Sequence, residues 1–312
     1  MRVAAVHLDT KFADVSYNLT QAEKAIKEAK EDRVELLVFP EFFTTGFALD
    51  GAMLKAITAS SHTLEWMKKM SKRSNIVLCG SYLCYYPKEN KILNTFSIVM
   101  PDGTCYHHSK DIPTAIESLY YEKGDQISVF ETSIGRIGVA MCWEQIRYQT
   151  VRRMIGKVDF VVAGSCWWNF CKEDGGKYYK AFHKKNQLMA EEAPEQFARL
   201  LGVPVIHASH AGGFMGKSMG RPKQTCKREI LGFTEIVDES GNVLVRYEKE
   251  TKPYVLVDIP LISLKSRKQK IPKFRYWIPD MPWGLKVGFY LSNHNSHKWY
   301  CQNTLKKVSK KQ

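Results

Sequence analysis

Long apolar runs are missing from this chain of 312 residues. No stretch approaches the roughly 18 uncharged apolar residues that a membrane-spanning helix needs, which excludes a membrane span. The N-terminus, MRVAAVHLD, lacks the apolar core and the small-residue cleavage site of a secretory leader. We therefore expect a cytoplasmic protein. Internal repeats and Ser/Gly-rich linkers are also missing, which favours one large domain.

Closely spaced cysteine pairs are missing as well. The chain has eight cysteines, at positions 79, 84, 105, 142, 166, 171, 226 and 301. A disulfide framework is not expected, because such frameworks belong mostly to small secreted domains. The nearest pairs, Cys79/Cys84 and Cys166/Cys171, lack the Cys-x-x-Cys spacing of metal sites, and no histidine pair completes either one. The sequence thus predicts reduced core thiols, no metal and no cofactor.

Acidic residues are scarce at the C-terminal end. The net charge of the chain is +14, and in residues 265–312 twelve Lys and Arg stand against Asp280 alone, so this segment carries +11. The same segment is rich in large aromatic residues: Phe274, Tyr276, Trp277, Trp283, Phe289 and Tyr290. We expect one main domain over 1–264 and an ordered extension over 265–312. A lone chain would leave the large apolar area of this extension exposed, so we expect the extension to contact a second subunit. A homodimer or higher homo-oligomer is the prediction, and nucleic-acid binding by the basic segment is the alternative.

Strands and helices alternate along the chain. Period-2 and short apolar runs predict strands at 2–9, 34–41, 75–86, 135–142, 158–164, 204–210 and 254–261. Helical spacing predicts helices at 18–31, 63–74 and 148–155, with Asn18 or Thr20 as the first cap, and places 195–202 inside a further helix. Gly80 is expected to break its strand. Turn residues at 101–103 and 240–242 predict antiparallel hairpins. The order favours an α/β protein with two sheets and helices on both outer faces.

Three polar side chains stand where apolar strands end. Glu41 ends VELLVFPE, Lys110 ends GTCYHHSK and Cys142 ends GRIGVAMC. Singly, each has an ordinary explanation as a cap, a solvated charge or a core thiol. Together they supply what an attack on an electrophilic carbon needs: a base for the thiol proton, a thiolate, and a cation for the developing negative charge.

The segments FPEFF, SKDIPTAIE and GRIGVAMCWE resemble, in this order, the three motifs of the nitrilase superfamily of carbon–nitrogen hydrolases. The resemblance extends from about residue 3 to residue 258. It implies a four-layer α-β-β-α sandwich, with Glu41 as general base and Cys142 as nucleophile. It also implies that Lys110 and the backbone N–H of Trp143 hold the oxyanion, and that Glu117 is the second glutamate, which orients the lysine and the substrate.

The resemblance leaves the substrate open. The Lys-x-x-Pro-Thr-x-x-Glu spacing and the Cys-Trp-Glu sequence favour a nitrile, whereas a small amide or carbamoyl compound is the wider norm of the family and is our expectation. A catalytically idle binding protein with a nucleic-acid-binding tail is the rival from another class. Trp143 and Trp167 are expected to contact the substrate, although ordinary packing explains Trp167 equally well. His107 and His108 are expected to be structural or exposed.

Overall fold

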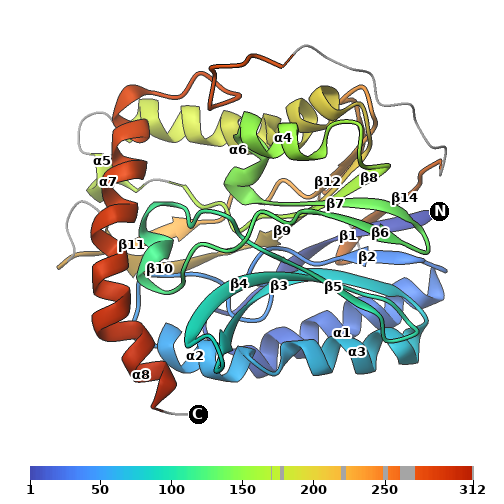
Figure 1. The fold of residues 1–312 in the computed structure, drawn as a ribbon, viewed down its shortest axis with the longest axis horizontal. Helices are drawn as coiled ribbons and strands as arrows, with labels where there is room; N and C mark the ends of the chain where they lie inside the picture. Colours follow the sequence, from blue (N-terminus) through green and yellow to red (C-terminus); the bar gives the residue numbers. More distant parts are fainter. Residues whose placement is uncertain (170, 176–178, 219–222, 249–251, 261–270, 311–312) are drawn as a thin grey trace.

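The centre of the molecule is one hydrogen-bonded sheet whose two halves form separate layers (Figure 1). The structure, a computed structural model, describes residues 1–312 except 170, 176–178, 219–222, 249–251, 261–270 and 311–312. The first half contains β1 (Arg2–Asp9), β2 (Leu36–Val38), β3 (Val77–Tyr86), β4 (Lys91–Val99) and β5 (Cys105–Ser109). The second half contains β6 (Val129–Thr132), β7 (Gly135–Met141), β8 (Phe160–Gly164) and β9 (Val205–Ala211).

The strand order is β5-β4-β3-β2-β1-β9-β8-β7-β6. The two halves join where residues 7–9 of β1 pair in parallel with residues 209–211 of β9. Three later strands complete the sheet: β12 (Glu235–Val237) pairs with β9 and with β13 (Val243–Arg246), and β14 (Tyr254–Asp258) pairs with β1. A separate hairpin consists of β10 (Gly213–Lys217) and β11 (Thr225–Glu229).

Helices cover the outer face of each half. In Figure 1, α1 (Val15–Glu31), α2 (Met53–Ser60) and α3 (Thr63–Ser74) lie below the first half, and α4 (Tyr148–Met154) and α6 (Tyr179–Leu201) lie above the second. Strand alternation explains the layers, because Val3 and Ala5 of β1 face the other sheet half while Ala4 and Val6 face α1 and α3. A third apolar cluster lies between β7–β9 and the helices α4 and α6. The predicted four-layer α-β-β-α architecture is confirmed.

Local details differ from the sequence-based expectation. The cap of α1 is Asp14, whose side chain accepts the N–H of Tyr17, and Asn18 is instead buried and bonded to the backbone of residues 11 and 44. The expected break at Gly80 is wrong, since β3 continues through this residue. A glycine is needed at this position because a side chain would collide with Phe39 and Phe43. The glycine therefore serves close packing against the segment that leads to residue 41.

The C-terminal segment packs on its own chain. It forms α7 (Trp283–Trp299), a π-helical turn (Tyr300–Thr304) and α8 (Leu305–Ser309), and α7 contacts the 3-10 helix η1 (Ala115–Leu119). Trp277 and Phe289 are buried, so the expectation that a lone chain leaves these two rings exposed is wrong. Phe274, Trp283 and Tyr290 are exposed, as expected.

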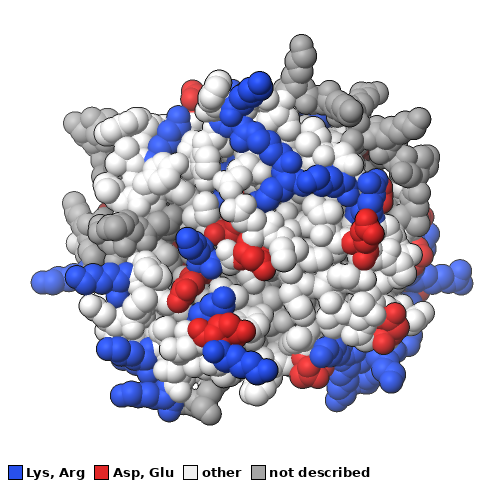
Figure 2. Space-filling model, viewed as in Figure 1, with Lys and Arg blue, Asp and Glu red and all other residues white. Residues whose placement is uncertain are grey.

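Basic side chains occur on several elements of the surface. On the face drawn in Figure 2, Lys and Arg form a run across the upper part, where α4, α6 and the chain leading into α7 lie, and they mix with Asp and Glu below it. Within the part of the chain that the structure describes, no helix combines the length and apolar character needed to cross a bilayer.

Candidate active site

Glu41, Lys110 and Glu117 form one buried cluster. Lys110 Nζ lies 2.8 Å from Glu41 Oε1 and 2.7 Å from Glu117 Oε2. Glu41 and Lys110 are fully buried and Glu117 nearly so. Glu41 follows β2, Lys110 follows β5, and Glu117 lies in η1, so the fold brings together three segments that are far apart in sequence. Charges removed from water in this way are costly unless they are paired, which makes the pairing of Lys110 with both carboxylates necessary.

Further polar groups fix the Glu41 carboxylate. The side-chain amide of Asn94, on β4, donates to Oε1 at 3.0 Å, and the backbone N–H of Cys166 donates to Oε2 at 3.1 Å. Both oxygens of this carboxylate therefore have a fixed donor besides Lys110. Asn94 is absent from the residues expected from sequence, although it lies in the segment NTFSIVM that precedes the lysine.

Glu117 is held from its own helix. Its Oε2 accepts the backbone N–H of Thr114 at 2.8 Å, which forms half of a capping box at the start of η1, and it also accepts the hydroxyl of Tyr121. Ala115 has a positive φ of 51°, which an alanine adopts only under constraint. The helix start is thus shaped so that this carboxylate faces Lys110.

The cluster perturbs the acid–base properties of its members. Burial raises the pKa of Glu41 to about 7, although the neighbouring Lys110 charge opposes the shift. Burial lowers the pKa of Lys110, but the carboxylates of Glu117 and Glu41 outweigh it and hold that pKa well above its ordinary value. Near neutral pH the site therefore contains a permanent cation and a carboxyl group able to gain or lose a proton.

Cys142 lies at the junction of β7 and the 3-10 helix η2 (Cys142–Ile146). Its φ is +47°, a left-handed conformation that is rare for a residue with a side chain and clusters at functional sites. Burial and the Glu41 charge raise the pKa of its thiol well above the ordinary value, while Lys110 lowers it. Cys142 is therefore a protonated thiol at rest and lies within the field of the Glu41–Lys110–Glu117 cluster.

A second buried ionic group supports the turn. Glu144 lies 2.9 Å from His108 Nε2 and accepts the backbone N–H groups of Met141 and Asp111 at 2.8 and 3.0 Å. Desolvation opposes the ionised form of Glu144, but His108 outweighs it and holds the Glu144 pKa well below its ordinary range. The predicted structural role of His108 is consistent with this position, and His107 is exposed. The Glu144 carboxylate thereby ties the strand end before Cys142 to the residue after Lys110.

A cavity of about 170 Å³ opens beside Cys142 and Glu117. Its walls are mainly apolar and include both tryptophans expected from sequence, Trp143 and Trp167, together with Trp168. The ring of Trp143 stacks on Phe289 of α7 at a centroid distance of 5.6 Å. The C-terminal segment thus supplies a wall of the pocket in the same chain, which the sequence did not indicate because nothing in the composition of the segment identifies its contact.

Comparison with known proteins agrees with the fold. Residues 2–269 match the carbon–nitrogen hydrolase family model. The chain is 21% identical to a probable nitrilase of Schizosaccharomyces pombe over 89% of this chain and 96% of that protein. It is 22% identical to the N-carbamoylputrescine amidase of Arabidopsis thaliana over 86% and 89% of the two chains. The crystal structure of a carbon–nitrogen hydrolase from Helicobacter pylori G27 superimposes with a TM-score of 0.69 at 18% identity, covering 83% of this chain and 90% of that one.

Proposed function

Because the chain belongs to the carbon–nitrogen hydrolase family, we propose that it hydrolyses a small amide or carbamoyl compound through an acyl-enzyme on Cys142. Glu41 accepts the thiol proton as the sulfur attacks the carbonyl carbon. Lys110 and the backbone N–H of Trp143 stabilise the oxyanion. Protonated Glu41 then gives its proton to the departing amine or ammonia, and ionised Glu41 activates the water that cleaves the thioester to a carboxylic acid.

One observation carries this proposal. The Cys142 thiol, on a turn with positive φ, lies in the field of the buried Glu41–Lys110 pair and lines the apolar cavity. A pKa of about 7 suits Glu41 to accept and return a proton at neutral pH. Glu117 is proposed as a positioning residue, since its carboxylate holds Lys110 at 2.7 Å.

The pocket favours an uncharged, apolar acyl group on the substrate. Among the described residues that line the cavity, Glu117 is the only charged one, and its carboxylate already binds Lys110, Thr114 and Tyr121. A charged substituent would enter this space without a counter-ion, at a large desolvation cost. The small volume limits the acyl group to a short aliphatic chain or a single ring.

A matched panel of compounds tests the proposal. Ammonia or amine release is measured for an amide, an N-carbamoyl compound and a nitrile that carry the same apolar substituent, and for the same amide carrying a carboxylate. We expect the uncharged amide or carbamoyl compound to give the highest kcat/KM. Cys142→Ala should abolish turnover, and intact mass should show an acyl adduct in the wild type. Cys166→Ala is the control, because it removes a second buried thiol near Glu41 that the proposed reaction does not use and keeps the backbone N–H that donates to Glu41.

Other outcomes would replace the proposal. Turnover confined to the nitrile would favour the nitrilase alternative, which the Cys-Trp-Glu sequence also supports. Binding of these compounds without turnover would favour an idle binding protein on this fold. Retention of one tenth of the wild-type rate in Cys142→Ala would contradict the assignment of the nucleophile.

Helix α7 offers an independent test of the pocket. Gly284 and Gly288 line the cavity, and a side chain at either one would meet no atom within 4 Å, so it would extend into empty space. Gly288→Val should raise KM for the bulkier amides more than for the smallest one. Leu291→Val, at an exposed position of the same helix, is the control and should leave the ranking unchanged.

We also propose that residues 265–312 extend the 1–264 domain and mediate a homodimer or higher homo-oligomer. Three large rings of α7 remain exposed: Trp283, Tyr290 and Trp299 at 77%, 55% and 42%. Replacement of Trp283 and Tyr290 by serine should lower the mass measured by light scattering. An unchanged mass would remove this segment as the contact, and a loss of salt-sensitive nucleic-acid binding would favour the alternative role.

The proposed location is the cytoplasm. Eight free cysteines support it, because thiols stay reduced in that compartment.

A further inference from the structure

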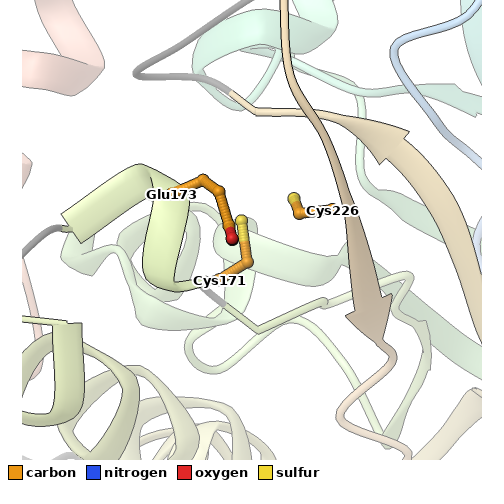
Figure 3. A group of neighbouring side chains, drawn as sticks. All are labelled: Cys171, Glu173 and Cys226. Carbon is orange, nitrogen blue, oxygen red and sulfur yellow. The ribbon is translucent and has the colours of Figure 1, made fainter.

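Two thiols and a carboxylate lie side by side (Figure 3), and one of the thiols, Cys171, stands a few positions after Trp167 and Trp168 in the chain. Cys171 directly precedes the short helix α5 (Lys172–Gly175), Glu173 lies in that helix, and Cys226 lies on β11. One ligand atom from each residue lies within 4.8 Å of the other two. Both cysteines are buried, and none of the three side chains takes part in the proposed reaction.

We propose that Cys171, Glu173 and Cys226 bind one divalent cation that prefers thiolate ligands, with Zn²⁺ as the best match. Neighbouring ligand atoms of a tetrahedral zinc site are roughly 3.5–3.8 Å apart, given metal–ligand distances of about 2.0–2.3 Å. The observed separations therefore need only small side-chain rotations to close around a metal. Two sulfur ligands select against Mg²⁺ and Ca²⁺, which prefer oxygen. A water molecule would complete the tetrahedron.

The surroundings hold the three ligands in place. Arg228 of β11 forms a buried ion pair with Asp174 of α5 at 2.7 Å, and an Asp174 oxygen accepts the backbone N–H of Cys171 at 3.2 Å. The guanidinium also lies over the ring of Trp168 at 4.3 Å. These contacts join α5 to β11 without using a carboxylate or a thiol of the cluster, so the ligands are positioned before a metal arrives.

The charges and protons of such a site balance. Cys171 and Cys226 would bind as thiolates, because zinc takes the deprotonated form of a cysteine side chain. Zn²⁺ would displace two protons and leave two thiolates and a carboxylate around it, a net charge of −1. The three residues line a second, more polar cavity, and Lys172 and Lys227 in the same lining would offset this charge in part, since Glu229 lies there too.

The sequence predicts no metal because cysteines that are close along the chain, such as Cys166 and Cys171, lack the spacing of a metal site. The fold instead pairs Cys171 with Cys226, 55 positions later. The loop between Cys166, which donates to Glu41, and Cys171 contains the pocket residues Trp167 and Trp168. A metal at this end of the loop would therefore fix a wall of the active-site pocket.

Metal titration of the full-length protein tests this inference. The protein is stripped with a chelator under reducing conditions in a Cys142→Ala background, so that the active-site thiol cannot contribute. It is then titrated with Zn²⁺ against a chromophoric chelator and with Co²⁺ by absorption. We expect one equivalent of Zn²⁺, release of two protons in weak buffer, and thiolate-to-cobalt charge-transfer bands with the visible bands of tetrahedral cobalt. These readouts do not depend on the substrate or on the proposed function.

Variants identify the ligands. Cys226→Ser should abolish the charge-transfer bands or reduce the affinity by at least about tenfold, and Glu173→Gln should weaken binding while leaving the buried thiols untouched. Cys301→Ser, at an exposed cysteine elsewhere, is the control and should bind as the parent does. Absence of stoichiometric binding would overturn the inference. So would binding that is unchanged in both Cys226→Ser and Glu173→Gln, or peptide mapping that shows Cys171 and Cys226 joined in a disulfide instead.

Discussion

The reactivity of Cys142 toward an alkylating agent should decrease as the pH falls through about 7. The reason is that only ionised Glu41 accepts the thiol proton, and burial raises the pKa of Glu41 to about 7. Below that value the ionised fraction of such a group falls about tenfold for each pH unit, so it decreases roughly thirtyfold between about pH 8 and about pH 5.5. We expect the alkylation rate constant of Cys142 to decrease by the same factor.

The assay needs no knowledge of the substrate. The protein is treated with iodoacetamide across this pH range, and modification of Cys142 is followed by peptide mass spectrometry while circular dichroism monitors the fold. In Glu41→Gln the inflection near pH 7 should disappear, and the rate at the upper end should fall because the proton acceptor is gone. Glu235→Gln is a matched control. Burial also raises the pKa of Glu235 to about 7, but this carboxylate pairs with Arg246 at 2.6 Å on another part of the sheet.

Two results would refute the reasoning. A rate that stays constant across the range would show that no group with a pKa near 7 controls the thiol. An inflection that persists in Glu41→Gln would assign the control to another residue. If Glu235→Gln shifted the profile as much as Glu41→Gln, the effect would be one of general charge and not of a proton acceptor beside Cys142.

Three further perturbations test separate parts of the site. Tyr121→Phe removes one donor to Glu117 and should lower kcat by about tenfold with little change in KM, because Lys110 is less well positioned; an unchanged kcat would contradict this. His108→Ala removes the cation that is hydrogen-bonded to the buried Glu144 carboxylate and leaves it only the field of Arg147, so it should lower the free energy of unfolding by about 3–5 kcal/mol in urea titrations, whereas a loss below about 1 kcal/mol would show that the pair is dispensable. Removal of residues 271–312 takes away one pocket wall and should abolish turnover, and full activity of the shortened chain would refute that role.

The sequence identifies the strands that carry the site but not how their ends are held. Apolar runs predicted β3, β7 and β9 to within a few residues, since buried strands need apolar side chains at consecutive positions. Asn94 and Tyr121 were missed because a single amide or phenol that donates to a carboxylate leaves no periodic pattern. Helix α7 was missed for a related reason, since both its faces carry apolar residues and its contact with η1 depends on the whole fold.

The charges of the site explain why the thiol is protonated at rest and yet suited to attack. With Glu41 and Glu117 ionised and Lys110 protonated, the buried cluster carries a net −1. Ionising Cys142 into solvent would make this −2 inside the protein, and this repulsion adds to burial in raising the thiol pKa. Transfer of the proton to Glu41 avoids that cost, because the total stays at −1 while the negative charge moves from carboxylate to sulfur. As the sulfur attacks, the charge moves on to the substrate oxygen, where Lys110 and the Trp143 N–H are proposed to stabilise it. Each of these reaction steps keeps the total buried charge constant. Water therefore need not reorganise around the site to stabilise the proposed intermediate.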